Sequence, residues 1–292
     1  MDILVSLGVA LLALSSPGSV QVRHDLVYAP GDRGRLDVYA PKILPPHAPV
    51  VVFLYGGSWQ TGGKAMYRFV GVSLASRGIV TVIPDYRVYP EVRYPQFLRD
   101  NALAVAFAKV HAGEWGADPR RLYLVGHSAG AYNAAMLALD PRWLDAVGLS
   151  ARRDVAGVAG LAGPYDFLPL RDPKLKVIFG PQDRLADTQP INHATGDAPP
   201  LRLLAGDKDT VVDPGNSTRL AAAIAARGGV VSTRLYPGLG HISLLTSVSG
   251  LFRRPGGVLD DIVAFVNDRP PPVVARMAAP SVQQQPVSAQ AQ

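Results

Sequence analysis

A pentapeptide near the middle of the chain, residues 126–130, reads Gly-His-Ser-Ala-Gly and fits the pattern Gly-x-Ser-x-Gly. A short apolar, strand-prone stretch precedes it at 121–125, and a strongly helix-forming stretch follows it at 131–139. Strand, sharp turn and helix form the setting of a nucleophile elbow, in which small neighbours relieve the crowded backbone. We therefore predict that Ser128 is a nucleophile at a helix N-terminus, where free N–H groups favour negative charge. The alternative is a chance match in a chain with 29 glycines.

A serine hydroxyl becomes a strong nucleophile only when a base takes its proton, and the base needs an acid to orient it. Among the six histidines, His241 follows the last predicted strand in a glycine-rich loop. The carboxyl ends of strands are where active sites of α/β proteins collect, so we predict that His241 is the base. The alternative is a loop histidine at a helix N-terminus. His127 adjoins the serine, and we expect its side chain to point elsewhere.

Three aspartates follow a predicted strand between the serine and the histidine, at positions 207, 209 and 213. Asp207 suits the tight turn that it occupies, because an aspartate there can bond to its own backbone. Asp213 precedes a proline and a helix, so an N-terminal capping role fits it. We therefore predict that Asp209 is the acid.

A glycine-rich segment at 56–63 follows the predicted strand at 50–55. Backbone N–H groups held close to a reacting carbonyl stabilise the negative charge that develops on its oxygen. We predict that the amides of Gly57, Ser58 and Ala129 are these donors. The alternative is an ordinary glycine-rich turn, and neither a dinucleotide-binding nor a P-loop pattern is present.

Short apolar runs alternate with helical segments along the chain, which predicts a mostly parallel sheet with helices on both faces. The first two strands alternate in polarity and predict an antiparallel hairpin. The segment 163–200 is rich in Pro, Asp and Gly, and we expect a lid, a binding segment or a loose surface loop there. The predicted strands lie at 22–27, 36–39, 50–55, 80–83, 122–125, 155–161, 201–205 and 233–236, and the predicted helices at 66–76, 95–111, 129–139, 216–226 and 258–267.

Composition limits the class of protein and its partners. The 292 residues are 48% hydrophobic and 18% charged, as in a globular protein with a sizeable core. The formal charge of +6 comes from scattered basic residues, so we expect no nucleic-acid partner. With no cysteine there is no disulfide and no thiolate site. We expect neither a metal nor an organic cofactor, and the oligomeric state is left open.

The two ends differ from the middle of the chain. Residues 1–19 contain an apolar run too short to span a bilayer, which predicts a signal peptide or an N-terminal apolar segment. We favour export over a cytoplasmic location, although no basic residue precedes the run. Residues 270–292 are rich in Pro, Gln and Ala, and we expect them to be disordered. We predict one catalytic domain at 20–269.

With these motifs in chain order, the sequence resembles the α/β-hydrolase superfamily over about residues 22–268, in the carboxylesterase branch that includes hormone-sensitive-lipase-like and feruloyl-esterase-like enzymes. The resemblance implies an α/β-hydrolase fold with an eight-stranded, mostly parallel sheet. It also implies that Ser128 is the nucleophile, Asp209 the acid and His241 the base. The blocks that carry the resemblance are 36–41, 55–59, 84–87, 126–130, 206–209 and 240–241.

One block departs from the pattern of this branch. The usual His-Gly-Gly-Gly-Trp is replaced by Tyr-Gly-Gly-Ser-Trp at 55–59. The loop 56–64 is similar to that of prenylcysteine methylesterases, and arylformamidases also carry a modified loop. By the same resemblance, Asp85–Arg87 helps to position this loop.

The resemblance and the motifs together predict a serine carboxylester hydrolase that acts through an acyl-enzyme on a small-molecule ester. Two alternatives stay open. One is an amide or formamide hydrolase or a peptidase with the same three residues. The other is a hydrolase-like binding module without activity, which would be expected to lack one of the three.

Overall fold

The computed structural model describes residues 19–249, 252 and 254–268. Apart from Ser19, the predicted N-terminal segment lies outside these residues, as does the predicted tail at 270–292. Within the described ranges, no helix is both long enough and apolar enough to cross a membrane.

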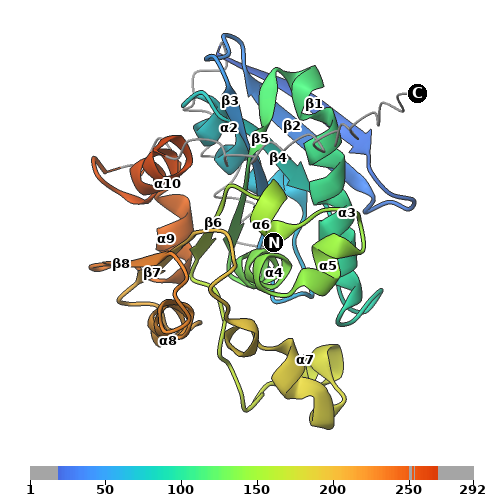
Figure 1. Ribbon diagram of the computed structural model, residues 1–292, viewed down its shortest axis with the longest axis vertical. Coiled ribbons are helices and arrows are strands. Elements are labelled where there is room, and N and C mark those ends of the chain that lie inside the picture. The colour runs from blue at the N-terminus through green and yellow to red at the C-terminus, as the bar shows by residue number, and fades with distance from the viewer. Residues whose placement is uncertain (1–18, 250–251, 253, 269–292) are drawn as a thin grey trace, which may run out of the picture.

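A single eight-stranded sheet runs through the molecule in the order β1-β2-β4-β3-β5-β6-β7-β8 (Figure 1). β1 and β2 pair antiparallel, as do β2 and β4, and the other neighbours are parallel. The predicted hairpin and the mostly parallel sheet are therefore confirmed. The strands are β1 (Val20–Val27), β2 (Arg35–Pro41), β3 (Ala48–Leu54), β4 (Val80–Pro84), β5 (Ala117–His127), β6 (Gly157–Leu161), β7 (Leu201–Gly206) and β8 (Val231–Tyr236).

Helices cover both faces of the sheet (Figure 1). α2 and α10 contact each other on one face, while α3, α4 and α8 pack on the other. The helices are α2 (Arg68–Ala75), α3 (Gln96–His111), α4 (Ala129–Leu139), α5 (Pro141–Asp145), α6 (Ala151–Asp154), α7 (Pro173–Phe179), α8 (Gly215–Ala225), α9 (His241–Thr246) and α10 (Val258–Asn267). The described residues also form the 3-10 helices η1 (Lys64–Tyr67), η2 (Ala112–Trp115), η3 (Gln182–Thr188) and η4 (Pro190–His193).

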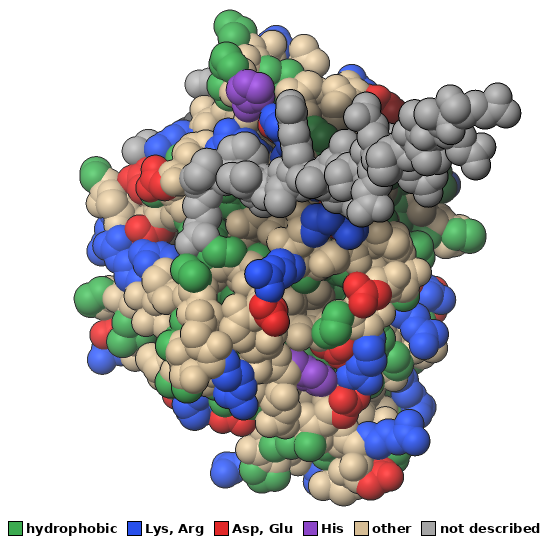
Figure 2. Space-filling model, in the orientation of Figure 1, with side chains coloured by type: hydrophobic (Ala, Val, Ile, Leu, Met, Phe, Trp, Pro, Cys, Tyr) green, Lys and Arg blue, Asp and Glu red, His purple; other side chains and the backbone are tan. Residues whose placement is uncertain are grey.

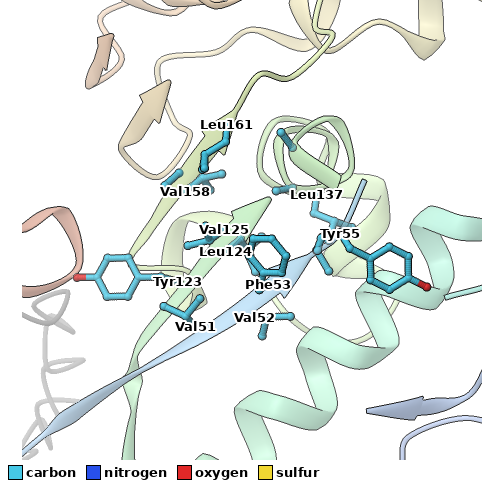
Figure 3. Close-up of a cluster of buried hydrophobic side chains, with 14 of the residues drawn as sticks. Val51, Val52, Phe53, Tyr55, Tyr123, Leu124, Val125, Leu137, Val158 and Leu161 are labelled. Atoms are coloured by element: carbon cyan, nitrogen blue, oxygen red, sulfur yellow. The ribbon is translucent and has the colours of Figure 1, made fainter. Parts of the chain in front are cut away.

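The centre of the sheet explains the continuous apolar runs of the sequence. All seven residues of β3 are buried, and so are Leu122–Val125 of β5, because helices cover the sheet on both sides. Figure 3 shows side chains of β3, β5, β6 and α4 packed into one cluster, with Phe53 and Leu137 among those labelled. This packed centre fixes the positions of the strand ends that carry the site.

The segment between β6 and β7 is an ordered part of the fold. It contains α7, η3 and η4 and lies at the lower end of the molecule, in yellow in Figure 1, and the space-filling view in Figure 2 shows this end continuous with the rest of the surface. Ile178, Phe179 and Leu185 of this segment are buried in the core cluster. The alternative of a loose surface loop is therefore wrong. Its short helices are missing from the prediction because they are too brief to show a helical period.

Gly71 offers a test of the contact between α2 and the sheet. A Cβ on this residue would lie 2.4 Å from Cδ2 of Tyr39, which is fully buried. Overpacking at such a position costs about 1–3 kcal/mol, so Gly71→Ala should lower the free energy of unfolding in urea by that amount. Gly113→Ala is the matched control, because nothing lies within 4 Å of a Cβ there. Equal stability of the two variants would contradict the packing argument.

Candidate active site

The predicted serine, histidine and aspartate meet at the carboxyl end of the sheet. His241 Nε2 lies 2.9 Å from Ser128 Oγ, and His241 Nδ1 lies 2.8 Å from Asp209 Oδ2. Ser128 and His241 are each 9% exposed and Asp209 is 8% exposed. Since burial lowers the local dielectric, hydrogen bonds between these groups are stronger than they would be in water.

Ser128 occupies the sharp turn between β5 and α4. Its φ of 54° and ψ of −122° form a strained conformation for a residue with a side chain. The flanking glycines are needed because a Cβ on Gly126 would lie 2.3 Å from the carbonyl oxygen of Gly130. A Cβ on Gly130 would lie 2.0 Å from the carbonyl oxygen of Leu54. The spacing of the pentapeptide is therefore required by backbone contact.

The three aspartates after β7 have different partners. Asp209 uses Oδ2 for His241, and its Oδ1 accepts hydrogen bonds of 2.9 Å from the amides of Val211 and Val212. Asp207 accepts from the amide of Gly238 and so holds the facing loop. Asp213 accepts from the Gly215 amide at the start of α8. The geometry thus separates one aspartate that orients the histidine from two that hold loops.

These contacts define where the protons lie. A carboxylate can only accept, so the hydrogen bond to Asp209 requires the proton of neutral His241 on Nδ1. Nε2 then carries a free lone pair 2.9 Å from Ser128 Oγ. This arrangement can remove the proton of the serine hydroxyl.

The loop after β3 faces the serine. Gly57, Ser58 and Trp59 all have positive φ, at 134°, 53° and 57°. Gly57 must be glycine, because a Cβ there would also lie 2.2 Å from the carbonyl oxygen of Thr61. Ser58 and Ala129 line the same pocket as Ser128. Among the described residues, no group accepts a hydrogen bond from the amides of Gly57, Ser58 or Ala129.

Tyr55 and Asp85 brace this loop at its base. Tyr55 donates to Asp85 Oδ1 at 3.1 Å, and the same oxygen accepts from the Lys64 amide at 2.7 Å. Burial raises the pKa of the Asp85 carboxyl, against the effect of these donors. Tyr86 donates to the Tyr55 carbonyl at 2.7 Å, while Arg87 pairs with Asp100. Within Asp85–Arg87, the first two residues therefore contact the loop.

A pocket of about 660 Å³ opens over the serine. Its apolar wall includes Phe167, Leu175 and Val212. Charged side chains also line the pocket, where Arg219 bonds to Asp166 at 2.6 Å and to Asp213 at 3.0 Å. The Gly215 amide and the Arg219 guanidinium lower the pKa of Asp213. The pocket thus suits a molecule with an apolar body.

Trp59 joins the loop after β3 to the segment between β6 and β7. Its indole N–H donates to Asn133 Oδ1 at 3.0 Å. Its ring stacks on Phe167 at 6.0 Å and meets the edge of Phe179 at 4.7 Å. The part of the predicted lid or binding segment between Pro164 and Leu175 therefore lines the pocket, and the contact of Phe167 with Trp59 holds it there.

The direction of the His127 side chain differs from the prediction. Its side chain lies against His241, with ring centroids 4.8 Å apart, and Nε2 is 3.2 Å from the His241 carbonyl oxygen. Burial, together with the charge that His241 can carry, lowers the pKa of His127 to about 3. The prediction that this side chain points elsewhere is wrong, because alternation along a strand does not apply at the sharp turn where β5 ends.

The sheet, the elbow and the pocket define a member of the α/β-hydrolase superfamily, in its carboxylesterase branch. More narrowly, the chain belongs to the BD-FAE family, whose model matches residues 36–224. The predicted resemblance and fold class are confirmed. The region described holds no group of three or more His, Cys, Asp or Glu residues that could bind a metal ion.

Two relatives that this chain resembles in sequence are named as esterases. Isoprenylcysteine alpha-carbonyl methylesterase ICME of Arabidopsis thaliana is 31% identical over 270 residues, which cover 85% of this chain and 63% of that protein. Esterase LipC of Mycobacterium tuberculosis is 28% identical over 241 residues, which cover 75% of this chain and 59% of that protein. The chain therefore spans about three fifths of the length of these curated relatives.

Solved structures share the fold. A truncated carbohydrate esterase from gut microbiota has a TM-score of 0.74 at 20% identity, covering 87% of this chain and 97% of its own. An inhibited esterase B from Lactobacillus rhamnosis has a TM-score of 0.74 at 21% identity, covering 89% of this chain and 91% of its own. The architecture is thus shared by proteins of widely different sequence.

The pKa of His127 predicts a pH dependence of stability. Because an unfolded histidine has a pKa of about 6.5, residue 127 binds up to one more proton in the unfolded chain than in the folded chain between pH 6.5 and 3. The contribution of residue 127 to the free energy of unfolding therefore rises with pH in this window, by up to about 1.4 kcal/mol per pH unit. This contribution is lost as the pH falls. His127→Gln should remove this pH-dependent contribution to the free energy of unfolding, because glutamine does not titrate. Parallel pH profiles of urea unfolding for wild type and variant would contradict it.

Proposed function

We propose that this protein is a serine hydrolase that cleaves small-molecule carboxylic esters through an acyl-enzyme, within a catalytic domain at 20–269. The observation that carries the proposal is the continuous hydrogen-bonded chain from Asp209 through His241 to Ser128, which ends in the pocket. The names of the relatives support the reaction class.

In the first half of the reaction, His241 Nε2 takes the proton of Ser128 as Oγ attacks the ester carbonyl carbon. The carbonyl oxygen becomes an oxyanion that the amides of Gly57, Ser58 and Ala129 stabilise, with each donor contributing about 3–4 kcal/mol in comparable enzymes. The bond to the alkoxy oxygen then breaks, and the alcohol leaves with the proton from His241. The acyl group remains on Ser128.

In the second half, water occupies the place of the alcohol. His241 takes a proton from the water as its oxygen attacks the acyl carbon, and the proton returns to Ser128 Oγ when the acyl bond breaks. Asp209 keeps the imidazole in the Nδ1–H form and stabilises it when it is protonated. Water and ester are consumed, and acid and alcohol are released.

The substrate that we propose is an ester with an apolar acyl part and a small alcohol. The apolar wall of the pocket and the tightly braced loop at Gly57 and Ser58 support this choice. So does the name of the Arabidopsis relative, which is a methylesterase. A panel of short and long acyl methyl esters, aryl esters and formamides tests it, and preferred cleavage of formamides would contradict it.

Ser128→Ala should lower kcat for p-nitrophenyl acetate by at least about 10⁴-fold, because no nucleophile remains. Far-UV circular dichroism should be unchanged. Ser249→Ala is the control, since Ser249 Oγ is buried without a hydrogen-bond partner among the described residues and its loss should leave the rate unaffected. Turnover in Ser128→Ala at the wild-type rate would overturn the assignment.

The choice of acid is tested separately. Asp209→Asn should lower kcat by about 10⁴-fold, as an amide favours the wrong imidazole tautomer. Asp213→Asn should reduce kcat by less than tenfold, because Asp213 contacts Gly215 and Arg219 instead of the base. Steady-state kinetics of both variants decide the matter, and a larger loss for Asp213→Asn would move the acid to that position.

A further inference from the structure

A second histidine links the strand that ends at the nucleophile to the helix that begins with the base. His127 is the last residue of β5, and His241 is the first residue of α9. The His127 Nε2 atom lies 3.2 Å from the backbone carbonyl oxygen of His241, across 114 positions of sequence. The two rings are 4.8 Å apart and tilted by 48°. His127 is 2% exposed.

The protonation of His127 follows from its surroundings. A carbonyl oxygen can only accept, so the neutral ring carries its proton on Nε2 and donates it to His241. Nδ1 then holds a bare lone pair, and it has no hydrogen-bond partner among the described residues. Burial lowers the pKa of this ring to about 3, so the ring is neutral near pH 7.

The loop after β3 closes the other side of the ring. A Cβ on Gly56 would lie 3.1 Å from His127 Nδ1 and 3.0 Å from Ser128 Cβ. The absence of a side chain at Gly56 therefore leaves just enough room for the imidazole. His127 is held between this glycine and the base.

We infer that His127 is a positioning residue for His241, which acts by donating a hydrogen bond to the backbone of the base and by supporting the face of its ring. The inference rests on the proposed function. His127 is not among the residues that line the pocket, so we expect its effect to pass through His241.

The base needs such support because of where it lies. α9 has only six residues and follows a loop in which Gly238 has a φ of 76°. Short helices gain little stability of their own. A shift of about 1 Å in a catalytic group can lower the rate by about 10²-fold. The bond from His127 ties the backbone of the base to the rigid central strand that carries Ser128.

Neutrality of His127 also suits the reaction. His241 becomes positively charged each time it takes a proton, and the group that faces it on one side is the Asp209 carboxylate. The group on another side is the His127 ring. A second positive charge at this distance would oppose protonation of the base, and a neutral imidazole does not.

Two variants separate the hydrogen bond from the volume of the ring. His127→Gln keeps a neutral N–H donor, whereas His127→Leu is apolar and has none. With p-nitrophenyl acetate, we expect His127→Leu to lose at least about tenfold in kcat with KM within twofold, the size expected for one lost hydrogen bond. His127→Gln should stay within about threefold of wild type.

His193→Leu is the matched control, because His193 Nε2 also bonds to a backbone carbonyl, that of Asp187 at 2.7 Å, outside the pocket. It should leave kcat unchanged. Active-site titration with a fluorophosphonate separates a folding defect from a positioning defect. We expect the Leu variant to label fully at Ser128 but more slowly than wild type.

Two results would overturn the inference: equal losses in the Gln and Leu variants, or a labelled fraction in the Leu variant that falls in proportion to kcat. Failure of the proposed function would look different, since wild-type protein would then neither hydrolyse the ester nor label at Ser128.

Discussion

The site depends on one distance, the 2.9 Å between His241 Nε2 and Ser128 Oγ, which joins residues 113 positions apart. Local structure cannot set this distance, because the two residues belong to different elements. The parallel strands set it by bringing the turns after β5, β7 and β8 to the same end of the sheet. Buried central strands with helices on both faces make that end rigid, so the three side chains are positioned before a substrate arrives.

Among the described residues, half of the non-glycine residues with positive φ lie where the chemistry is proposed. Ser128, Ser58 and Trp59 all have positive φ although they carry side chains. Such conformations cost about 1–3 kcal/mol each and persist only where the surroundings hold them. The surroundings are visible here: glycines at 126 and 130 allow close backbone contact, and Trp59 is held by Asn133 and by aromatic rings. The core thus stabilises two turns that would otherwise relax.

Much of this arrangement could be predicted from the sequence, for physical reasons. Continuous apolar runs indicate the central strands, and the pentapeptide indicates the turn that must follow one of them. The aspartate could be chosen because its two neighbours had evident local roles, which the contacts of Asp207 and Asp213 agree with. The short helices α5, α7 and α9 are absent from the predicted helices, because each has too few turns to show a helical period in the sequence. The position of the His127 ring depends on a turn of β5 against α9, a long-range contact that no local pattern encodes.

The unexpected position of His127 changes how the site is understood. Asp209, with its carboxylate held by two backbone amides and by His241, is the negative group that faces the base. On another side the base meets an imidazole that burial keeps uncharged. In the proposed reaction, His241 can therefore take a proton beside a carboxylate and without a competing cation at the His127 ring. The pentapeptide therefore contributes two residues, His127 and Ser128, that both contact His241.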